Sequence, residues 1–466
     1  MSDRAVRRLP EALIDLSVPR RCHVVGVGGP GMAPIAVLLA SCGHSVSGSD
    51  MRDSAVLDVL RGAGVAITVG HDAALVEGVD VVLYSTAVPR TNVEIAAADA
   101  AGIPVRHRSG ILASISALVP TIGVAGTHGK STTTGILVGM LTAAGLDPSA
   151  IVGGDVPGLT AGARTGKGPV FVLECDESDG SLDVLSPASL IVTNVDVDHL
   201  DYFGTFEEVQ RSFVDAALRA TGTVVVCADD ANSAPVAEAV PGSVSFGRER
   251  ADVRIVGVEQ SADGSIVIVD GRYGSHRIVS RLRGEHNASN IAAAFTRACA
   301  HGVDPVVAAS SVAGFGGVER RFTERGRHNG ALLVDDYAHL PAEIAAAVST
   351  MRSHPEVTGR VAAVFQPNRF HRIAAMADAY ADCFEGADLV VVTDVYASGT
   401  APIEGVTGRL VVDAIVAAHP DADVVWAPSR ADIVKVVDAW LEPGDGCISM
   451  GCGDIATFPD DLGAEA

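Results

Sequence analysis

Residues 121–134 read TIGVAGTHGKSTTT, and this stretch decides the fold class of the chain. A short apolar run leads into a glycine-rich turn that ends in Gly129, Lys130 and Ser131, after which a helical pattern opens. Glycines let backbone N–H groups close around phosphate oxygens, a helix N-terminus favours an anion, the lysine supplies a cation, and the serine hydroxyl can bind Mg²⁺. The pattern therefore predicts a strand–loop–helix unit that binds a nucleotide phosphate.

This loop is a variant of the strict Walker spacing, because Val124 stands where a glycine is usual. An alternative interpretation is that the glycines only shape a strand-to-helix turn. The Lys130-Ser131 pair, in its strand–loop–helix context, favours the phosphate loop.

The composition of the 466-residue chain excludes several classes of function. Its length is enough for about three domains. Hydrophobic residues make up 48% and aromatic residues only 4%, which is typical of α/β proteins with buried parallel strands. A formal net charge of −23 argues against nucleic-acid and anionic-membrane partners. The eight cysteines show no CxxC pair or zinc spacing, and no run of ~18 apolar residues occurs, so we expect a cytoplasmic protein with reduced thiols and no membrane insertion.

Strand-like and helix-like segments alternate along the chain, with breaks near Pro120 and near Gly317. This predicts an α/β fold of three domains with mostly parallel sheets. We expect a Rossmann-like domain over residues 1–120, a central phosphate-loop domain over 121–317 and a Rossmann-like domain over 318–466. Residues 244–283 alternate apolar and polar side chains, which predicts antiparallel strands within the central domain.

A second glycine-rich loop, Gly26-Val27-Gly28-Gly29-Pro30-Gly31, directly follows a predicted strand, and Asp50 follows the next one. In dinucleotide-binding folds the glycines admit a diphosphate and the acid binds a ribose. Taken alone, this motif favours a nicotinamide oxidoreductase. It reports a bound diphosphate more reliably than it reports NAD.

Acidic residues follow two strands of the central block, in ECDESD at 174–179 and NVDVDH at 194–199. Open α/β sheets place ligands at the carboxyl ends of their strands, so these groups should lie beside the phosphate loop. Carboxylate and imidazole ligands there suit Mg²⁺. The alternative is a solvated acidic loop, and the neighbouring phosphate loop favours the metal.

Polar motifs continue towards the C-terminus, as HNASN at 286–290, RRF at 320–322, DDYAH at 335–339 and QPNRFHR at 366–372. Arginine forks near strand ends suit phosphate and carboxylate ligands. The simpler alternatives are that Asn287 caps a helix and that the arginines form surface ion pairs.

Taken together and in this order, the motifs resemble the Mur ligase family, and within it the branch that adds the first amino acid, L-alanine, to a peptidoglycan precursor. The motifs of the resemblance extend from HVVGVGGPGM at 23–32 to MGCGDI at 450–455 and cover nearly the whole chain. The resemblance implies three α/β domains that bind a UDP-sugar, ATP and the incoming amino acid in turn. It also reassigns the first glycine loop from NAD to the UDP diphosphate.

The implied activity is ATP-dependent ligation of L-alanine, or of glycine or L-serine, to the lactyl carboxylate of UDP-N-acetylmuramate through an acyl phosphate, with ATP and Mg²⁺ required. The implied catalytic residues are Lys130, Glu174, His199 and His339, and the implied metal ligands are Ser131, Glu174 and His199. The implied ATP-binding residues are Gly126, Thr127, His128, Gly129, Lys130, Ser131, Thr132, His286, Asn287, Asn290, Arg321, Asp335 and Asp336. The implied UDP-sugar residues are Gly28, Gly29, Gly31, Met32 and Asp50, and Tyr337, His339, Arg369 and Arg372 would surround the amino acid.

The chain departs from the family pattern at two positions, where Leu340 and Asn368 replace histidines of the usual DDYGHHP and FQPHRY. The amine substrate is therefore open between a small amino acid and, as in a recycling ligase of the family, an intact tripeptide. A nicotinamide oxidoreductase and a catalytically silent precursor-binding relative are the remaining alternatives. Both a monomer and a homodimer fit the sequence.

Overall fold

A computed structural model describes residues 11–261 and 263–464. The chain forms two compact units. The first comprises Met1–Gly257, Val267–Ser280 and Asn287–Val318, and the second comprises Val258–Ile266, Arg281–His286 and Glu319–Ala466. Among the described helices, none combines the length and the hydropathy needed to cross a bilayer.

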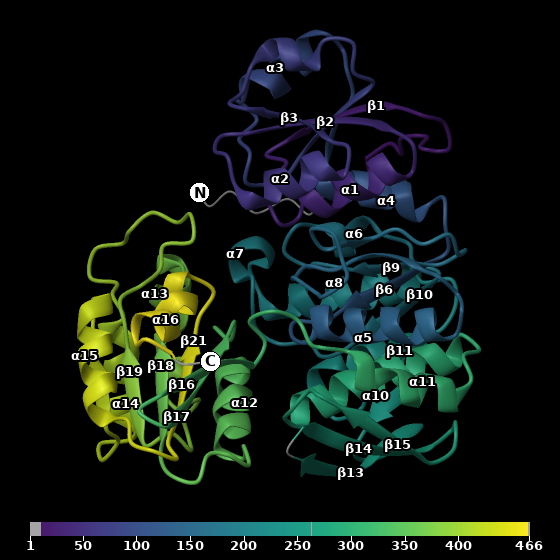
Figure 1. Cartoon of the computed structure of the whole chain (residues 1–466). Coiled ribbons are helices and arrows are strands. Elements are labelled where there is room, and N and C mark those ends of the chain that lie inside the picture. Colours follow the sequence, from purple (N-terminus) through teal and green to yellow (C-terminus); the bar gives the residue numbers. More distant parts are fainter. Residues whose placement is uncertain (1–10, 262, 465–466) are drawn as a thin grey trace. The chain divides into compact units, whose positions relative to one another are not determined.

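The first sheet has five parallel strands in the order β3-β2-β1-β4-β5. Its strands are β1 (Arg21–Val25), β2 (Ser45–Asp50), β3 (Ala66–Val69), β4 (Val81–Tyr84) and β5 (Val105–His107). Its helices are α1 (Ala33–Ser41), α2 (Ala55–Gly62), the 3-10 turn η1 (Ala73–Val76), α3 (Val93–Ala100) and α4 (Arg108–Ser116). Figure 1 shows α1, α2 and α4 on one face of this sheet and α3 on the other.

The second sheet has ten strands in the order β15-β14-β13-β12-β11-β10-β6-β9-β7-β8. They are β6 (Thr121–Ala125), β7 (Ser149–Ile151), β8 (Ala163–Arg164), β9 (Phe171–Glu174), β10 (Ser189–Val192), β11 (Val224–Cys227), β12 (Val244–Gly247), β13 (Val253–Ser261), β14 (Gly264–Gly271) and β15 (His276–Ser280). The helices are α5 (Lys130–Ala143), α6 (Ser181–Val184), α7 (Leu200–Phe203), α8 (Phe206–Arg219), η2 (Ala231–Ser233), α9 (Ala234–Ala239), α10 (Glu285–Ala300), α11 (Pro305–Ser311) and η3 (Val312–Gly314).

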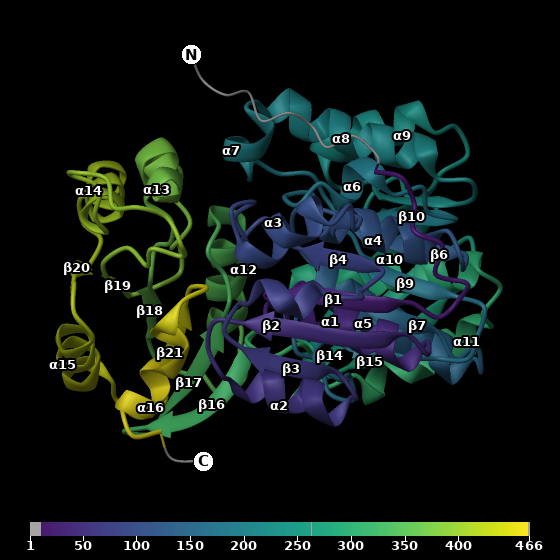
Figure 2. The ribbon, with the colours of Figure 1, turned by 90° about the horizontal axis from the view of Figure 1, so that it is seen from above.

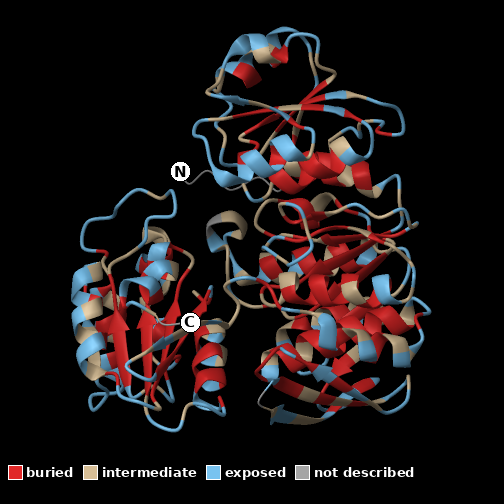
Figure 3. Ribbon diagram, viewed as in Figure 1, coloured by how far each residue is buried: buried red, intermediate tan, exposed pale blue. Residues whose placement is uncertain are grey.

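The central strands of this sheet are apolar because both of their faces are covered. All five residues of β6 are buried, and so are all four of β10 and of β11, as the red strands of Figure 3 show. Helix α8 starts where the Thr205 hydroxyl accepts a hydrogen bond from the Glu208 N–H at 3.3 Å, a side-chain cap of the kind that fixes helix starts. The core thus fixes β6, β9 and β10 side by side, and their carboxyl ends carry the predicted site.

The third sheet has the order β16-β17-β21-β18-β19-β20. Its strands are β16 (Thr323–His328), β17 (Ala331–Asp336), β18 (Val361–Phe365), β19 (Leu389–Val392), β20 (Val424–Trp426) and β21 (Gly446–Met450). Its helices are α12 (Pro341–Arg352), α13 (Phe370–Met376), η4 (Ala377–Tyr380), α14 (Arg409–Ala418), α15 (Arg430–Trp440), η5 (Asp454–Thr457) and α16 (Phe458–Asp461). Figure 2 shows α12, α13 and α14 on one face of the sheet and α15 and α16 on the other, and each face has its own apolar core.

The predicted α/β class with mostly parallel sheets is confirmed, since only the β7–β8 and β16–β17 pairs run antiparallel among the printed registers of the three sheets. One detail differs from the sequence prediction. Strand β12, at the start of the segment predicted to be antiparallel, pairs in parallel with β11, because α9 provides the crossover connection that a parallel pair needs. The boundaries at 120 and 317 stay a prediction.

Candidate functional site

The phosphate-type loop connects β6 to α5, as its glycine pattern predicts. Gly129 is the residue before α5 and has φ +79°, a left-handed conformation that favours glycine. A side chain at Gly129 would collide with Oδ1 of Asn290, and one at Gly126 would collide with the Thr193 hydroxyl. Glycine is therefore required at both positions by close packing, and at Gly129 also by the backbone conformation, since the loop backbone lies directly against neighbouring side chains.

The Lys130 ammonium lies inside this loop and is largely shielded from solvent, with 14% of its side chain exposed. Its Nζ donates to the carbonyl oxygens of Gly126 at 2.6 Å and Thr127 at 3.1 Å, and to the Glu177 carboxylate at 2.9 Å. Burial by itself would lower the pKa of Lys130, but the surrounding carboxylates, Glu177 foremost, outweigh it and raise that pKa above its usual value. The chain thus holds a permanently charged ammonium at the N-terminus of α5.

Carboxylates from the end of β9 and an imidazole from the end of β10 gather beside this ammonium. Asp176, Glu177 and His199 each offer a ligand atom, and these atoms lie within 4.8 Å of one another. Glu174 has different partners from that group. Its Oε1 accepts from the Ser131 hydroxyl at 3.0 Å, and its Oε2 accepts from the Gly153 N–H at 2.6 Å. Hard oxygen ligands with one imidazole suit a divalent cation such as Mg²⁺.

The predicted metal ligands therefore fall into two adjoining groups. Ser131 and Glu174 are hydrogen-bonded to each other, whereas His199 is grouped with Asp176 and Glu177. Asp176 and Glu177 were not predicted as ligands, although the run ECDESD carried the signal. His199 has φ +52° at the start of α7, so its backbone adopts a conformation that non-glycine residues seldom take.

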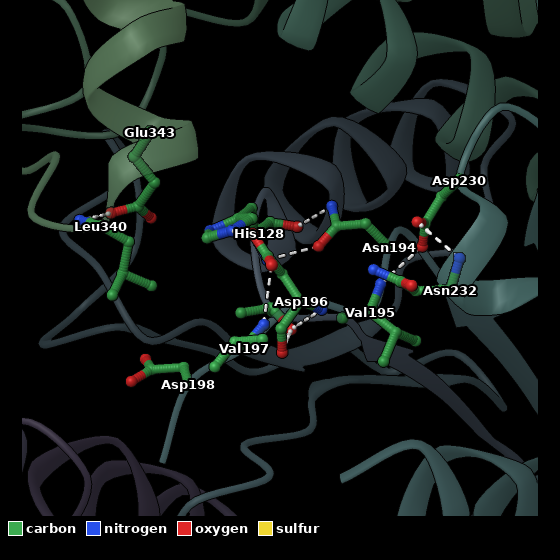
Figure 4. Close-up of polar contacts among 12 residues, drawn as sticks. His128, Asn194, Val195, Asp196, Val197, Asp198, Asp230, Asn232, Leu340 and Glu343 are labelled. Carbon is green, nitrogen blue, oxygen red and sulfur yellow. Dashed lines mark hydrogen bonds and ion pairs between the residues drawn. The ribbon is translucent and has the colours of Figure 1, made fainter. Parts of the chain in front are cut away.

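The end of β10 is hydrogen-bonded to the phosphate-type loop (Figure 4). The His128 N–H donates to Oδ1 of Asn194 at 2.8 Å, and Nδ2 of Asn194 donates back to the His128 carbonyl at 3.0 Å. Nε2 of His128 lies 3.0 Å from the Asp196 carboxylate, and this hydrogen bond lowers the pKa of Asp196. Asp230 supports the same segment by accepting the Val195 N–H at 2.7 Å. These side chains set the shape of the loop before any ligand enters.

One asparagine of α10, Asn290, contacts the end of this loop and the start of α5, and a second, Asn287, is bonded to Asn290. Oδ1 of Asn290 accepts from the Thr133 hydroxyl at 3.3 Å, and its Nδ2 donates to Oδ1 of Asn287 at 3.1 Å. Helix α10 begins at Glu285, so Asn287 lies inside the first turn and is not the residue before it. The alternative in which Asn287 only caps the helix is therefore wrong. His286 belongs to the second compact unit.

The first glycine loop connects β1 to α1 and contacts Asp50 directly. The Gly28 N–H donates to Oδ2 of Asp50 at 3.0 Å, and a Cβ at Gly28 would lie 3.0 Å from that oxygen and 3.1 Å from Leu57. The Gly31 carbonyl accepts from Nε of Arg108 at 2.9 Å, and Arg108 also forms an ion pair with Asp179. Met32 is buried as the residue before α1. No sequence pattern indicates the Arg108–Asp179 pair, because its partners are far apart along the chain.

In the second unit, the predicted nucleotide residues surround the end of β17. Asp335 accepts from Nε of Arg320 at 3.1 Å, and the Asp336 carboxylate accepts the N–H groups of Phe322 and Ala338, each at 2.7 Å. Burial raises the pKa of Asp336 to about 6. These bonds fix the β17–α12 turn, which carries Tyr337 and His339.

Two arginine guanidinium groups lie over the Tyr337 ring. The centre of the Arg320 group is 5.2 Å from the ring centroid and that of Arg321 is 5.3 Å, distances typical of cation–π contacts. Arg321 also lies 3.5 Å from Glu343 of α12. The turn therefore presents positive charge at the carboxyl end of its strand.

His339 and Leu340 lie at the start of α12. Glu343 accepts the His339 N–H at 3.0 Å and the Leu340 N–H at 3.3 Å, so its carboxylate closes the first turn of the helix. Figure 4 shows the bond between Leu340 and Glu343. Leu340 is buried, which leaves His339 as the imidazole of this turn.

Asn368 and Arg372 form a pair near the end of β18. The Arg372 guanidinium donates to Oδ1 of Asn368 at 2.7 Å, and both side chains are buried. Arg369 has φ +61°, so the backbone turns sharply between them. Where the family pattern has a histidine, this chain thus uses Asn368 to orient an arginine.

The sequence matches three consecutive profiles of one family. Residues 21–119 match the "Mur ligase family, catalytic domain", residues 124–298 the "Mur ligase middle domain", and residues 320–453 the "Mur ligase, glutamate ligase domain". Together these profiles cover most of the chain.

Relatives of similar length carry one name. The chain is 41% identical over 453 residues to the UDP-N-acetylmuramate–L-alanine ligase of Bradyrhizobium sp. (strain ORS 278), covering 94% of this chain and 95% of that protein. It is 38% identical over 445 residues to the ligase of the same name from Rubrobacter xylanophilus, covering 95% and 99%. The crystal structure of the UDP-N-acetylmuramate–alanine ligase from Thermotoga maritima superimposes with a TM-score of 0.78 at 26% identity, covering 95% of this chain and 98% of that one.

Proposed function

Because the chain belongs to the Mur ligase family, we propose that it joins L-alanine to the lactyl carboxylate of UDP-N-acetylmuramate and converts one ATP to ADP and phosphate. The observation that carries the proposal is its similarity, along nearly the full length of both chains, to proteins named UDP-N-acetylmuramate–L-alanine ligase. The reaction is a step of peptidoglycan precursor synthesis and takes place in the cytoplasm, where ATP is available.

The loop Gly126–Thr132 is our candidate for the ATP phosphates. Its backbone N–H groups at the start of α5 favour an anion, and the charged Lys130 ammonium supplies a cation for the transferred γ-phosphoryl group. For that, the ammonium exchanges its bonds to Glu177 and to the loop carbonyls for bonds to phosphate oxygens. We assign His286, Asn287, Asn290, Arg321, Asp335 and Asp336 to the rest of the nucleotide.

The donor set beside the loop fits magnesium. Ser131, Glu174 and His199 are the proposed ligands, and the grouping of His199 with Asp176 and Glu177 adds two carboxylates within reach. Mg²⁺ bound there neutralises charge on phosphate and carboxylate oxygens. Several carboxylates around a single ammonium repel one another, and a bound cation would offset that repulsion. This supports a divalent cation as part of the active site.

We assign Gly28, Gly29, Gly31, Met32 and Asp50 to the UDP-sugar. The proposed reaction has two steps. The lactyl carboxylate oxygen attacks the γ-phosphorus and ADP leaves, which gives an acyl phosphate. The neutral α-amine attacks the acyl carbon, the C–O bond to phosphate breaks, and the amine loses a proton as the amide forms. Activation is needed because an unmodified carboxylate has no good leaving group.

The amino acid is assigned to the turn that holds Tyr337 and His339 and to the arginines Arg369 and Arg372. Arginine pairs with a carboxylate through a planar fork, which suits the carboxylate of a free α-amino acid. His339 is the imidazole available to accept the amine proton. Asn368 positions Arg372 in this proposal, and both a monomer and a homodimer are compatible with it.

Phosphate release from ATP tests the proposal. The purified protein is incubated with ATP, Mg²⁺ and UDP-N-acetylmuramate, and L-alanine, glycine, L-serine or the tripeptide L-alanyl-γ-D-glutamyl-meso-diaminopimelate is added. We expect release with L-alanine and slower release with glycine and L-serine. Activity with the tripeptide alone would select the recycling ligase. Reduction of NAD without phosphate release would restore the oxidoreductase interpretation, and binding without turnover would indicate a silent relative.

A further inference from the structure

Glu94 is a buried carboxylate to which no motif of the sequence drew attention. It is the second residue of α3, and its side chain has no exposed surface. Its Oε2 accepts from Nε2 of His23 at 3.2 Å and from the Ser49 hydroxyl at 2.6 Å. Its Oε1 accepts from Nδ1 of His71 at 3.1 Å and from the Asp72 N–H at 3.1 Å. One carboxylate thus takes four hydrogen bonds.

These four hydrogen bonds hold Glu94 in its ionised form. Burial would raise the pKa of Glu94, but the hydrogen bonds from His23, Ser49 and His71 outweigh it and lower that pKa. An ionised carboxylate only accepts, so the contact of Nδ1 of His71 with Glu94 is one in which Nδ1 donates, and Nε2 is the ring nitrogen that Glu94 does not engage. The His71 side chain is 20% exposed, so the ring reaches the surface.

Three of the four donors, Ser49, His71 and Asp72, lie at or just after the carboxyl ends of β2 and β3, and His23 lies in the middle of β1. Ser49 is the residue before Asp50 at the end of β2, and its carbonyl accepts the N–H groups of Gly26 and Val27 at 2.9 and 3.0 Å. Asp50 in turn accepts the Gly28 N–H. His71 and Asp72 follow β3, which is the neighbour of β2 in the sheet. Helix α3, which carries Glu94, lies on the opposite face of the sheet to α1 in Figure 1, and from there Glu94 holds Ser49 of β2 and the residues that follow β3.

We propose that Glu94 is a positioning residue for the UDP-sugar: it places Ser49, and through it Asp50 and the loop N–H groups, and it holds the His71 ring through Nδ1, so that Nε2 is left for the bound nucleotide. This inference rests on the proposed function, because it takes the first glycine loop as the UDP-sugar site. Glu94 itself contacts no substrate.

Titration calorimetry with UDP and, separately, with ATP tests the proposal on the full chain. Glu94→Ala leaves His71, Ser49 and the Asp72 N–H without their acceptor, and we expect UDP to bind at least about tenfold more weakly, while ATP affinity changes less than about twofold. Glu94→Gln keeps an acceptor for His71 and Asp72, so it should recover most of the UDP affinity. In steady-state assays the loss should appear in KM for UDP-N-acetylmuramate and not in kcat.

Asp80→Asn is the matched control. Asp80 also supports this sheet, by accepting the Arg21 N–H at 2.7 Å, but it precedes β4 and so lies at the opposite ends of the parallel strands. We expect UDP affinity to be unchanged in this variant. If Glu94→Ala does not fold, Ser49→Ala removes one of the four bonds and should still weaken UDP selectively.

Equal losses for UDP and ATP, or unchanged UDP affinity in Glu94→Ala and Ser49→Ala, would overturn the positioning role. Failure of the proposed function itself would be recognised by a different result. If the wild-type chain binds neither UDP nor UDP-N-acetylmuramate, the assignment of the first glycine loop is wrong, whatever Glu94 does.

Discussion

The first unit contains two glycine-rich loops with the same local architecture and different chemistry. Each follows a buried parallel strand and opens a helix, β1 to α1 in one case and β6 to α5 in the other. At the first loop, Asp50 accepts the Gly28 N–H, Glu94 lies behind Asp50, and the Arg108 guanidinium donates to the Gly31 carbonyl. At the second loop a partly buried ammonium, that of Lys130, lies inside the loop itself and is paired with the Glu177 carboxylate.

This difference indicates that the same backbone motif can have separate roles, which depend on the charged groups beside it. A loop that only binds a diphosphate needs N–H groups and close backbone approach, which glycines provide. A loop at which a phosphoryl group is transferred also needs charge that is already in place when the transition state forms. In our account the first loop holds the UDP-sugar and the second holds ATP.

Replacing Lys130 should have the largest effect. Lys130→Ala removes the cation aimed at the transferred phosphoryl group, so we expect kcat to fall on the order of 10²- to 10³-fold. UDP binding at the first loop should be unchanged. Near wild-type turnover would show that the two loops do not differ in the way proposed. Circular dichroism checks the fold, because Glu177 loses its buried partner in this variant.

Gly28→Val should produce the reverse pattern with a smaller loss. The new side chain would push against Asp50 and Leu57, so we expect UDP affinity to fall about tenfold or more while ATP affinity is retained. Calorimetry with each nucleotide separately is the measurement. Weaker ATP binding with intact UDP binding would show that the first loop binds ATP and not the UDP-sugar.

The comparison also shows what the sequence could and could not reveal. Both loops were predicted, because each is a contiguous motif after a strand, and so was the class of fold. The support behind each loop was not predicted. His23, Ser49, His71 and Glu94 come from separate elements and carry no spacing signal. Contacts of this kind form only when the sheet order is set, and the sequence does not state that order.

The predicted metal set illustrates the same limit within one motif. The run ECDESD marked the correct strand end, but spacing alone did not indicate that Glu174 faces Ser131 while Asp176 and Glu177 group with His199. Which carboxylates bind Mg²⁺ stays a prediction. The same holds for the nucleotide and amino-acid residues of the second unit.

A smaller effect is expected where the chain departs from the family pattern. Restoring histidines with Leu340→His and Asn368→His should change the ratio of kcat/KM among L-alanine, glycine and L-serine by up to about tenfold, since Arg372 loses its partner and one methyl group is worth only ~1–3 kcal/mol. ATP affinity should be largely unaltered. A changed ATP affinity with the same amine ratio would instead place these residues at the nucleotide.

The smallest expected effect concerns stability at acid pH. The pKa of Glu94 in the folded chain lies below its ordinary value of 4.5, so its contribution to stability is present above that pH and is lost as the pH falls through the folded-state pKa. Glu94→Gln should therefore flatten the acid dependence of the free energy of unfolding relative to wild type. Urea titrations at several pH values measure this. Parallel pH profiles would show that Glu94 is not held ionised.

The two loops are proposed to bind two different ligands, and a crystal structure of the chain with UDP-N-acetylmuramate, a non-hydrolysable ATP analogue and Mg²⁺ would test this assignment. We expect the UDP diphosphate to lie against the N–H groups of Gly28–Gly31 and the triphosphate against Gly126–Thr132, with Lys130 turned from Glu177 to the γ-phosphate. Density for the UDP diphosphate at the second loop, or for the triphosphate at the first, would contradict it.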